Sequence, residues 1–432
     1  MQSTLDRIAD WMATRPWYSP GPGGIPRLRE LAELFLPSPD PTARVRLLLV
    51  RDDAPETPVL YQVPLVERDV LADPSAPGLI GAGYGGATLF DGVADSAFAA
   101  ALLAGIHEAG HLRDSADDRM IVESTLVADG QDPVLRLQPY GRPALEAHLH
   151  RRVLDGPHPD AVAAEALADA GAGALPRLAG VLPVRWVEDG TAHVAHLAVV
   201  RESTAPTIDG WRHVAAAARH GAEADLGALG RTLGAVHRAL GDQLSRHATT
   251  PDERATAVGA WRTRLAGAAS EVSAVADLAE ALEEVYRRAE ALPEWPTTQA
   301  VHGALELGLT SRTDGGDWLL HAFGGTQPTT GGERVDLAAL DLAGVLRSLH
   351  YAAGFAGVAG AWAEEQRSAL RQGYAAAAGE AAIPGALVDA LEADFAVVDA
   401  VWEARGRPEA VGIPLAALRR IAGGSRRGAL AA

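Results

Sequence analysis

A short stretch of the sequence, His107-Glu108-Ala109-Gly110-His111, has residue types and a spacing that suit zinc chemistry. On a helix, the two imidazoles would share one face, with the glutamate between them as a general base. Gly110, however, weakens a helix inside the motif, and the sequence shows no identifiable third ligand. We therefore expect a polar helix end carrying two histidines, and we keep a zinc hydrolase as the least favoured alternative.

A looser group of histidines lies further along the chain beside an arginine pair: His148, His150 and His158, with Arg151 and Arg152. Charged and polar residues gathered in this way are typical of a solvated helix end, which is what we expect here. Four scattered tryptophans could stack on a sugar, although core packing is the more common role of the residue; they are Trp17, Trp211, Trp318 and Trp402.

The composition limits the classes of partner. With 38 Lys and Arg against 56 Asp and Glu, the net charge is −18, which repels polyphosphate backbones and argues against nucleic acid. The absence of cysteine excludes disulfides, thiolate zinc sites and a cysteine nucleophile, and it fits a reducing compartment. No uncharged apolar run is long enough to cross a bilayer, so we expect a cytoplasmic protein without a membrane partner.

The elements that must position any site follow from periodicity. Strands are predicted at 44–50, 59–66, 120–127, 134–138, 194–200 and 318–323. Helices are predicted at 4–14, 98–111, 143–154, 226–244, 255–292 and 337–358. A polar break at 114–118 indicates a domain boundary. This order, a mixed α/β region followed by a helical one, predicts an α+β protein with two lobes and an added N-terminal domain.

Short segments along nearly the whole chain occur in an order typical of one family. They are Tyr61-Gln62-Val63-Pro64-Leu65-Val66, Leu197-Ala198-Val199-Val200, Asp209-Gly210-Trp211, Leu229-Gly230-Arg231-Thr232, Val236-His237-Arg238-Ala239-Leu240, Asp341-Leu342-Ala343-Gly344-Val345-Leu346-Arg347-Ser348, Tyr351-Ala352-Ala353, Glu403-Ala404-Arg405 with Arg407-Pro408, and Ile413-Pro414-Leu415-Ala416-Ala417. In this order they resemble the maltokinases, within the wider aminoglycoside-phosphotransferase and protein-kinase-like group.

The resemblance implies an α+β, two-lobed protein-kinase-like fold with an N-terminal cap domain of the maltokinase type. The expected domains are a cap at residues 1–113, a small intermediate lobe at 114–205 and a large helical C-terminal lobe at 206–432. The resemblance also implies a place near the metabolism that links trehalose to glycogen-like glucans, with a protein of that pathway as one possible partner.

Phosphoryl transfer in the family that this chain resembles uses a base in a His-Gly-Asp-x-His-x-x-Gln loop. The corresponding loop here runs from His302 to Leu309, with Ala304 at the base position and Glu306 two residues later. Leu309 takes the position of the amide that faces the metal ion. A methyl group accepts no proton, and leucine offers no oxygen to a hard cation.

The family's Ile-Asp-Phe-Glu-Gly strand end, which supplies the Mg²⁺ carboxylate, reads His321-Ala322-Phe323-Gly324-Gly325 in this chain. Ala322 and Gly324 therefore replace both carboxylates. The resemblance implies nucleotide contacts from Arg136, in place of a lysine whose geometry it does not reproduce, and from Arg201 and Glu202 at the lobe junction. A solvated loop explains the last two residues equally well.

Together these replacements remove the base and the metal ligands on which the reaction depends. We expect a maltokinase-like pseudokinase that binds a sugar, a nucleotide or a partner protein near glucan and trehalose metabolism. An active kinase for maltose or glucosamine, with ATP and Mg²⁺ as cofactors, stays an alternative in which Glu306, His321 or Asp341 substitutes. For Asp341 we favour a capping or hinge role at the start of the helix. We expect no metal site otherwise.

Overall fold

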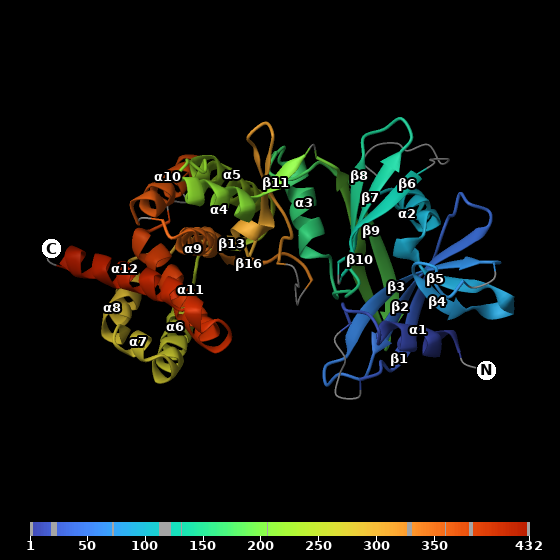
Figure 1. The fold of residues 1–432 in the computed structure, drawn as a ribbon, viewed down its shortest axis with the longest axis horizontal. Coiled ribbons are helices and arrows are strands. Elements are labelled where there is room, and N and C mark those ends of the chain that lie inside the picture. Colours follow the sequence, from blue (N-terminus) through green and yellow to red (C-terminus); the bar gives the residue numbers. More distant parts are fainter. Residues whose placement is uncertain are drawn as a thin grey trace. The chain divides into compact units, whose positions relative to one another are not determined.

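The computed structural model describes residues 3–18, 24–70, 73–111, 122–130, 132–204, 206–325, 331–358, 360–379 and 383–429. The contacts divide the chain into two compact units (Figure 1). Unit 1 consists of Met1–Glu165, Pro176–Thr204 and Pro328–Gly332, and unit 2 of Ala166–Leu175, Ala205–Gln327 and Glu333–Ala432. The predicted boundary at 113/114 and the polar break at 114–118 lie outside the described residues.

Unit 1 begins with a five-stranded antiparallel sheet in the order β1 (Leu28–Leu36), β2 (Ala43–Asp52), β3 (Val59–Arg68), β5 (Thr88–Asp91) and β4 (Leu79–Ala82). Alternate residues of β2 face opposite sides of this sheet. Leu48 and Val50 pack with α1 (Thr4–Met12), whereas Leu47 and Leu49 pack with α2 (Ser96–Glu108). Because both faces are buried, the strand reads as a continuous apolar run.

A second five-stranded sheet of unit 1 has the order β6 (Val122–Ala128), β7 (Val134–Pro139), β8 (Leu145–Leu149), β10 (Thr191–Glu202) and β9 (Leu178–Glu188). Helix α2 contacts strands of both sheets, and the two sheets share one hydrophobic cluster. The Gln62 side-chain amide donates to the His150 carbonyl at 2.8 Å, which adds a polar link between the sheets. Helix α3 (Pro159–Asp169) follows β8.

The predicted strands at 44–50, 59–66, 134–138 and 194–200 are confirmed as β2, β3, β7 and β10. The predicted helix at 143–154 is wrong, because β8 occupies Leu145–Leu149 and pairs with both β7 and β10. The Ala and Leu content favoured a helix, but two neighbouring strands override that weak propensity.

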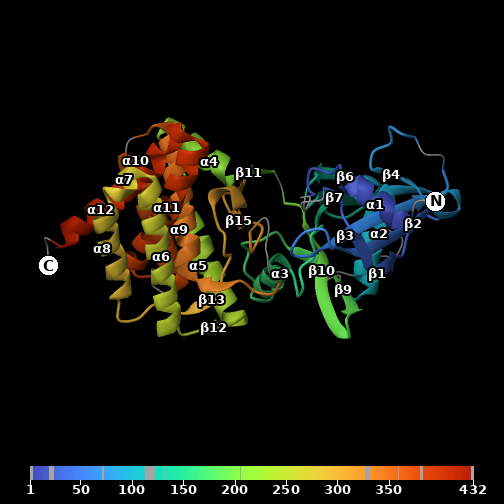
Figure 2. The ribbon, with the colours of Figure 1, turned by 90° about the horizontal axis from the view of Figure 1, so that it is seen from below.

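Unit 2 is mainly helical, and its helices are α4 (Gly210–His220), α5 (Leu226–Gln243), α6 (Pro251–Glu271), α7 (Ser273–Ala276), α8 (Ala279–Glu290), α9 (Ala338–Ala356), α10 (Gly360–Ala378), α11 (Gly385–Gly406) and α12 (Gly412–Ala429). Helix α9 contacts α4, α10, α11 and α12, and Figures 1 and 2 both show it among these helices. Because most residues of α9 are buried, apolar side chains occur on nearly all of its faces.

Two small antiparallel sheets of unit 2 position the loops of interest. One has the order β11 (Thr207–Asp209), β14 (Thr310–Thr313) and β15 (Trp318–Leu320), and the other β12 (Arg246–His247), β13 (Thr298–Ala300) and β16 (Val335–Leu337). The loop after β13 and the loop after β15 contain the two segments that the sequence assigned to phosphoryl transfer.

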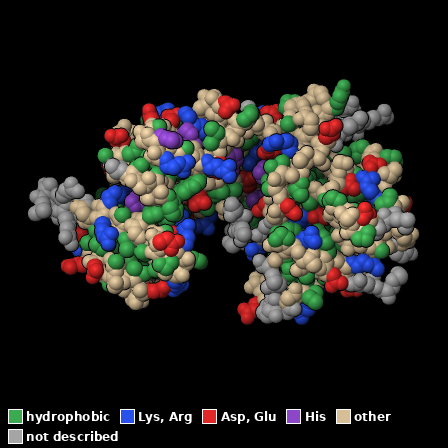
Figure 3. Space-filling model, viewed as in Figure 1, with side chains coloured by type: hydrophobic (Ala, Val, Ile, Leu, Met, Phe, Trp, Pro, Cys, Tyr) green, Lys and Arg blue, Asp and Glu red, His purple; other side chains and the backbone are tan. Residues whose placement is uncertain are grey.

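The surface carries charges of both signs. In Figure 3, acidic and basic side chains are interspersed over the face in view, and many of the exposed arginines pair with carboxylates, as Arg405 does with Glu271 at 2.6 Å. In the described part of the chain, none of the helices has the length and apolar character of a membrane span.

Candidate functional site

Two loops of unit 2 lie against each other where the sequence predicted the transfer chemistry. Residues 302–306 follow β13, and residues 321–325 follow β15. The Gly324 N–H donates to the His302 carbonyl at 2.8 Å. The His302 ring lies 4.6 Å from the Phe323 ring, centroid to centroid. The fold therefore brings the base loop and the metal-ligand strand end together.

The groups that meet at this junction carry no oxygen in their side chains. A Cβ atom added to Gly325 would lie 3.1 Å from the Ala304 Cβ, so these two positions are neighbours. Ala322 has a φ of 57°, in the left-handed region that a methyl-bearing residue rarely adopts. The alanine, glycine and leucine side chains at positions 304, 322, 324 and 309 offer neither an oxygen ligand for Mg²⁺ nor a proton acceptor.

Asp341, in the first turn of α9, holds the base loop in place. The buried carboxylate accepts hydrogen bonds from the His302 N–H at 2.8 Å, the Gly303 N–H at 2.9 Å and the His237 Nε2 at 3.0 Å. Burial raises the pKa of Asp341, but the His237 and Gly303 hydrogen bonds and nearby imidazole charge outweigh this effect and hold the pKa below its usual value. Helix α9 begins at Ala338, so Asp341 is not its cap.

The other two predicted substitutes lie in different surroundings. His321 is half-buried, and its Nε2 lies 2.7 Å from the Ser311 hydroxyl oxygen, so this imidazole is engaged with β14. Glu306 instead lies at the surface of unit 2, where its side chain is 49% exposed and forms a wide ion pair with Arg347 at 3.7 Å. Glu306 lines a pocket.

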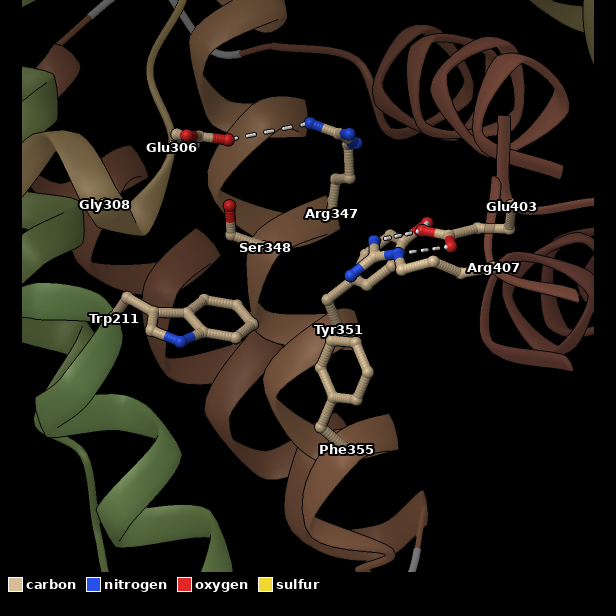
Figure 4. A pocket seen from close by; sticks show the side chains of 9 residues that line it. All are labelled: Trp211, Glu306, Gly308, Arg347, Ser348, Tyr351, Phe355, Glu403 and Arg407. Atoms are coloured by element: carbon tan, nitrogen blue, oxygen red, sulfur yellow. Dashed lines mark hydrogen bonds and ion pairs between the residues drawn. The ribbon is translucent and has the colours of Figure 1, made fainter. Parts of the chain in front are cut away.

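The pocket beside Glu306 has a volume of about 300 Å³ and lies entirely within unit 2 (Figure 4). Helices α4, α9 and α11 and the segments next to them supply its walls. The lining residues are Trp211, Glu306, Gly308, Arg347, Ser348, Tyr351, Phe355, Glu403 and Arg407. Aromatic rings and groups of both charges thus surround one small volume, a combination suited to a polar ligand with an apolar face.

Ion pairs fix most of the charged groups of the pocket. Arg347 donates to both Asp399 oxygens, at 2.6 and 2.7 Å, and Arg407 donates to both Glu403 oxygens, at 2.9 and 2.6 Å. Burial lowers the pKa of Arg347, but its bonds to Asp399 outweigh this and leave the pKa raised. Among the described residues, the ion pair of Glu306 is the wide contact to Arg347, so its half-exposed carboxylate is available to a ligand.

The predicted nucleotide contacts belong to unit 1. Arg136 on β7 is exposed and pairs with Glu146 on β8 at 3.0 Å. Arg201 is buried at the end of β10, where its Nη2 donates to the Asp160 carboxylate at 2.9 Å. Glu202 accepts a hydrogen bond from an arginine that precedes β9. Arg201 thus has a structural partner, and nucleotide binding by these three residues stays a prediction.

The zinc motif lies at the end of α2, where His111 is exposed beyond the last helical residue. Over the described ranges, no group of three His, Cys, Asp or Glu residues is placed to hold a metal ion. Nothing in the described structure therefore supports the zinc hydrolase.

The expectation of a solvated histidine group is wrong. His150 is 4% exposed and His158 is 6% exposed, and their rings stack with a centroid distance of 3.5 Å. The error follows from the predicted helix at 143–154, because β8 and the turn after it direct these side chains into the interior of unit 1.

Sequence reasoning gave no role to several lining residues of the pocket. Arg347, Tyr351 and Phe355 are spaced four residues apart, which places them on one face of α9, and Glu403 and Arg407 have the same spacing. This spacing is the signal that could have identified them. Trp211 was considered as a sugar platform, and the structure places it in the pocket.

Known proteins share this architecture. Residues 11–95 match the maltokinase N-terminal cap domain. A glucosamine kinase in complex with glucosamine, ADP and inorganic phosphate is similar, with a TM-score of 0.68 and 21% sequence identity over 97% of this chain and 99% of that chain. Another crystal form of glucosamine kinase gives a TM-score of 0.67 at 21% identity, over 98% and 99% of the two chains. The chain thus has the kinase-like α+β fold of this glucosamine kinase, and its residues 11–95 match the maltokinase N-terminal cap domain.

Proposed function

We propose that this chain is a sugar-kinase-like pseudokinase, which binds a sugar in the pocket beside Glu306 and does not transfer phosphate. The observation that carries the proposal is the junction of the two loops, where Ala304 meets Gly325 and Ala322 stands at the metal-ligand position. A phosphoryl-transfer site needs a base and oxygen ligands for a metal ion at these points.

The buried carboxylate of Asp341, which contacts the loop after β13, does not supply the missing base. Asp341 accepts two backbone N–H groups of the base loop and the His237 imidazole, so its oxygens are committed to holding that loop. Moving it toward a substrate would leave those buried N–H groups without partners, at a cost of about 1–3 kcal/mol each. This cost favours a structural role for Asp341 over a catalytic one.

An amino sugar is the ligand that the pocket suits best. Trp211, Tyr351 and Phe355 offer apolar ring surfaces, and Glu306 offers a carboxylate that is half exposed. A pyranose has an apolar face for stacking, and an ammonium group would pair with the carboxylate. The likeness to a glucosamine kinase bound to glucosamine points in the same direction.

Calorimetric titration with glucosamine, glucose and maltose tests the ligand. We expect glucosamine to bind best, and we expect Glu306→Gln to weaken that binding about tenfold or more. A charge-assisted hydrogen bond contributes about 1.5–3 kcal/mol, and each 1.4 kcal/mol corresponds to a tenfold change in affinity. Glu365→Gln, on the exposed face of α10, is the matched control and should leave binding unchanged.

The outcomes separate the parts of the proposal. Equal binding of glucosamine and glucose that is insensitive to Glu306→Gln would contradict the role of Glu306 in amino-sugar recognition. Failure of all three sugars to bind would contradict the sugar ligand itself and would favour a nucleotide or a partner protein.

A further inference from the structure

Two buried imidazoles of unit 1 lie face to face outside the pocket described above. His150 follows β8 and His158 precedes α3, and their rings are 3.5 Å apart with an angle of 3° between the planes. Both residues are more than nine-tenths buried. Two imidazolium ions at this distance would repel each other in a low-dielectric interior, so the stack requires at least one neutral ring, and burial favours the neutral form of both.

His158 also closes the N-terminal end of α3. Its Nδ1 accepts a hydrogen bond from the Asp160 N–H at 3.2 Å, and its carbonyl accepts from the Ala161 and Val162 N–H groups at 2.9 and 3.1 Å. A side-chain acceptor at this position is a helix cap. Protonation of Nδ1 would turn this acceptor into a donor and would place a positive charge at the positive end of the helix dipole.

Charged and titratable groups of the surrounding elements act on the pair or on the histidines beside it. They are Asp132 before β7, Glu146 and His148 on β8, Asp160 on α3, His196 and Arg201 on β10, and, near His196, His111 at the end of α2. Asp160 is itself paired with Arg201, at 2.9 Å. The Asp132 Oδ1 lies 3.4 Å from the His150 Nδ1.

We propose that the His150–His158 stack is a pH-sensitive lock on the first turn of α3, which opens when His158 takes up a proton. Opening would remove the cap of the helix and separate Asp160 from Arg201. The lock lies in unit 1 and is independent of the sugar pocket and of the proposed loss of transfer activity.

The direction of the pH effect follows from burial. Burial is the main cause that lowers the pKa of both His150 and His158 to about 3, whereas unfolded histidine titrates near 6.5. The two neutral imidazoles therefore stabilise the closed state fully above pH 6.5, and this contribution is lost as the pH falls from 6.5 toward 3. Burial also raises the pKa of Asp132 to about 6, and proton uptake by this carboxyl below pH 6 offsets part of the loss.

Hydrogen exchange measured by mass spectrometry at pH 7.5, 6.5 and 5.5 tests the lock. After correction for intrinsic rates, the opening constant of the α3 amides should rise by up to about tenfold per pH unit below 6.5, because opening takes up one proton. His158→Asn keeps a capping oxygen and cannot titrate, so the opening of its α3 amides should depend on pH much less than in the wild type. His220→Asn, at the exposed end of α4, is the matched control and should behave like the wild type.

A wild type whose α3 protection does not change with pH would overturn the proposal, as would an unchanged pH dependence in His158→Asn. If His158→Asn does not fold, ¹³C NMR of the imidazoles in the wild-type protein decides the matter. The lock requires two imidazoles that stay neutral while α3 is closed. Titration of all fourteen histidines near pH 6.5 with α3 still protected would overturn it.

Discussion

At the scale of single residues, the loop from His302 to Glu306 is held by a buried carboxylate, although Ala304 stands where the resemblance predicts a base. The Asp341 carboxylate binds the His302 and Gly303 N–H groups and is bound in turn by His237, which also contacts the Tyr374 hydroxyl at 3.0 Å. These contacts connect α5, α9 and α10 to the loop. A loop held in this way keeps its conformation although Ala304 cannot accept a proton.

Asp341→Asn tests this supporting role. The amide nitrogen would point a donor at groups that are themselves donors, and the buried imidazole would lose its anionic partner. We expect the free energy of unfolding to fall by about 3 kcal/mol, because each buried group left without a hydrogen-bond partner costs about 1–3 kcal/mol. Urea denaturation followed by circular dichroism measures the change. Asp242→Asn, in an exposed pair with Arg246, should shift stability by less than about 1 kcal/mol, and equal losses in both variants would contradict the role.

How far the site could be predicted depends on how it is distributed along the chain. Ala304 and Ala322, the positions predicted to be replaced, lie in short linear motifs, so that prediction could be made from the sequence alone. The pocket instead depends on pairs such as Arg347 with Asp399, which are far apart in sequence and meet only because α9 packs on α11. A local sequence pattern does not show which carboxylate on one helix pairs with which arginine on another.

At the scale of elements, glycines determine how closely α5 and α10 approach. A Cβ atom at Gly230 would lie 2.1 Å from the Leu370 carbonyl oxygen, and one at Gly373 would lie 2.1 Å from the Gly227 carbonyl oxygen. Backbones can meet at such distances only where side chains are absent. Helix α5 also carries His237, so this contact helps to place the partner of Asp341.

Gly230→Ala and Gly267→Ala form a matched pair of variants. Both positions are helical, but a Cβ atom at Gly267 on α6 meets nothing within 4 Å. We expect Gly230→Ala to destabilise by about 1–3 kcal/mol or more through overpacking, and Gly267→Ala to stabilise by up to about 1 kcal/mol through helix propensity. Thermal unfolding measures both changes, and effects of the same sign would contradict the close approach of α5 and α10.

The strands show where sequence patterns succeed and fail. The β2 and β3 strands were predictable because both are continuous apolar runs rich in valine and leucine. The β1 strand was missed, since its residues Leu28–Leu36 mix glutamate and arginine with leucine, and eight of the nine are partly buried or exposed. The β8 strand was mistaken for a helix because its five residues depend on pairing with β7 and β10.

At the scale of the whole molecule, the order of matching segments predicted the architecture that the structure has. The cap domain is confirmed over residues 11–95, and the kinase-like fold is confirmed by the likeness to glucosamine kinase. The domain limits at 113 and 205 stay predictions. Loss of catalysis cannot be inferred from a fold, since active and inactive kinases share it; it rests on the replaced residues and needs a direct assay.

The most direct test measures ADP release from ATP and Mg²⁺ at high protein concentration, with glucosamine, maltose, glucose and aminoglycosides. We expect no sugar-dependent release above background, either from the wild type or from Glu306→Ala, because the base and the metal ligands are missing together. Sugar-dependent release from the wild type would contradict the account, and its loss in Glu306→Ala would identify Glu306 as the replacement base.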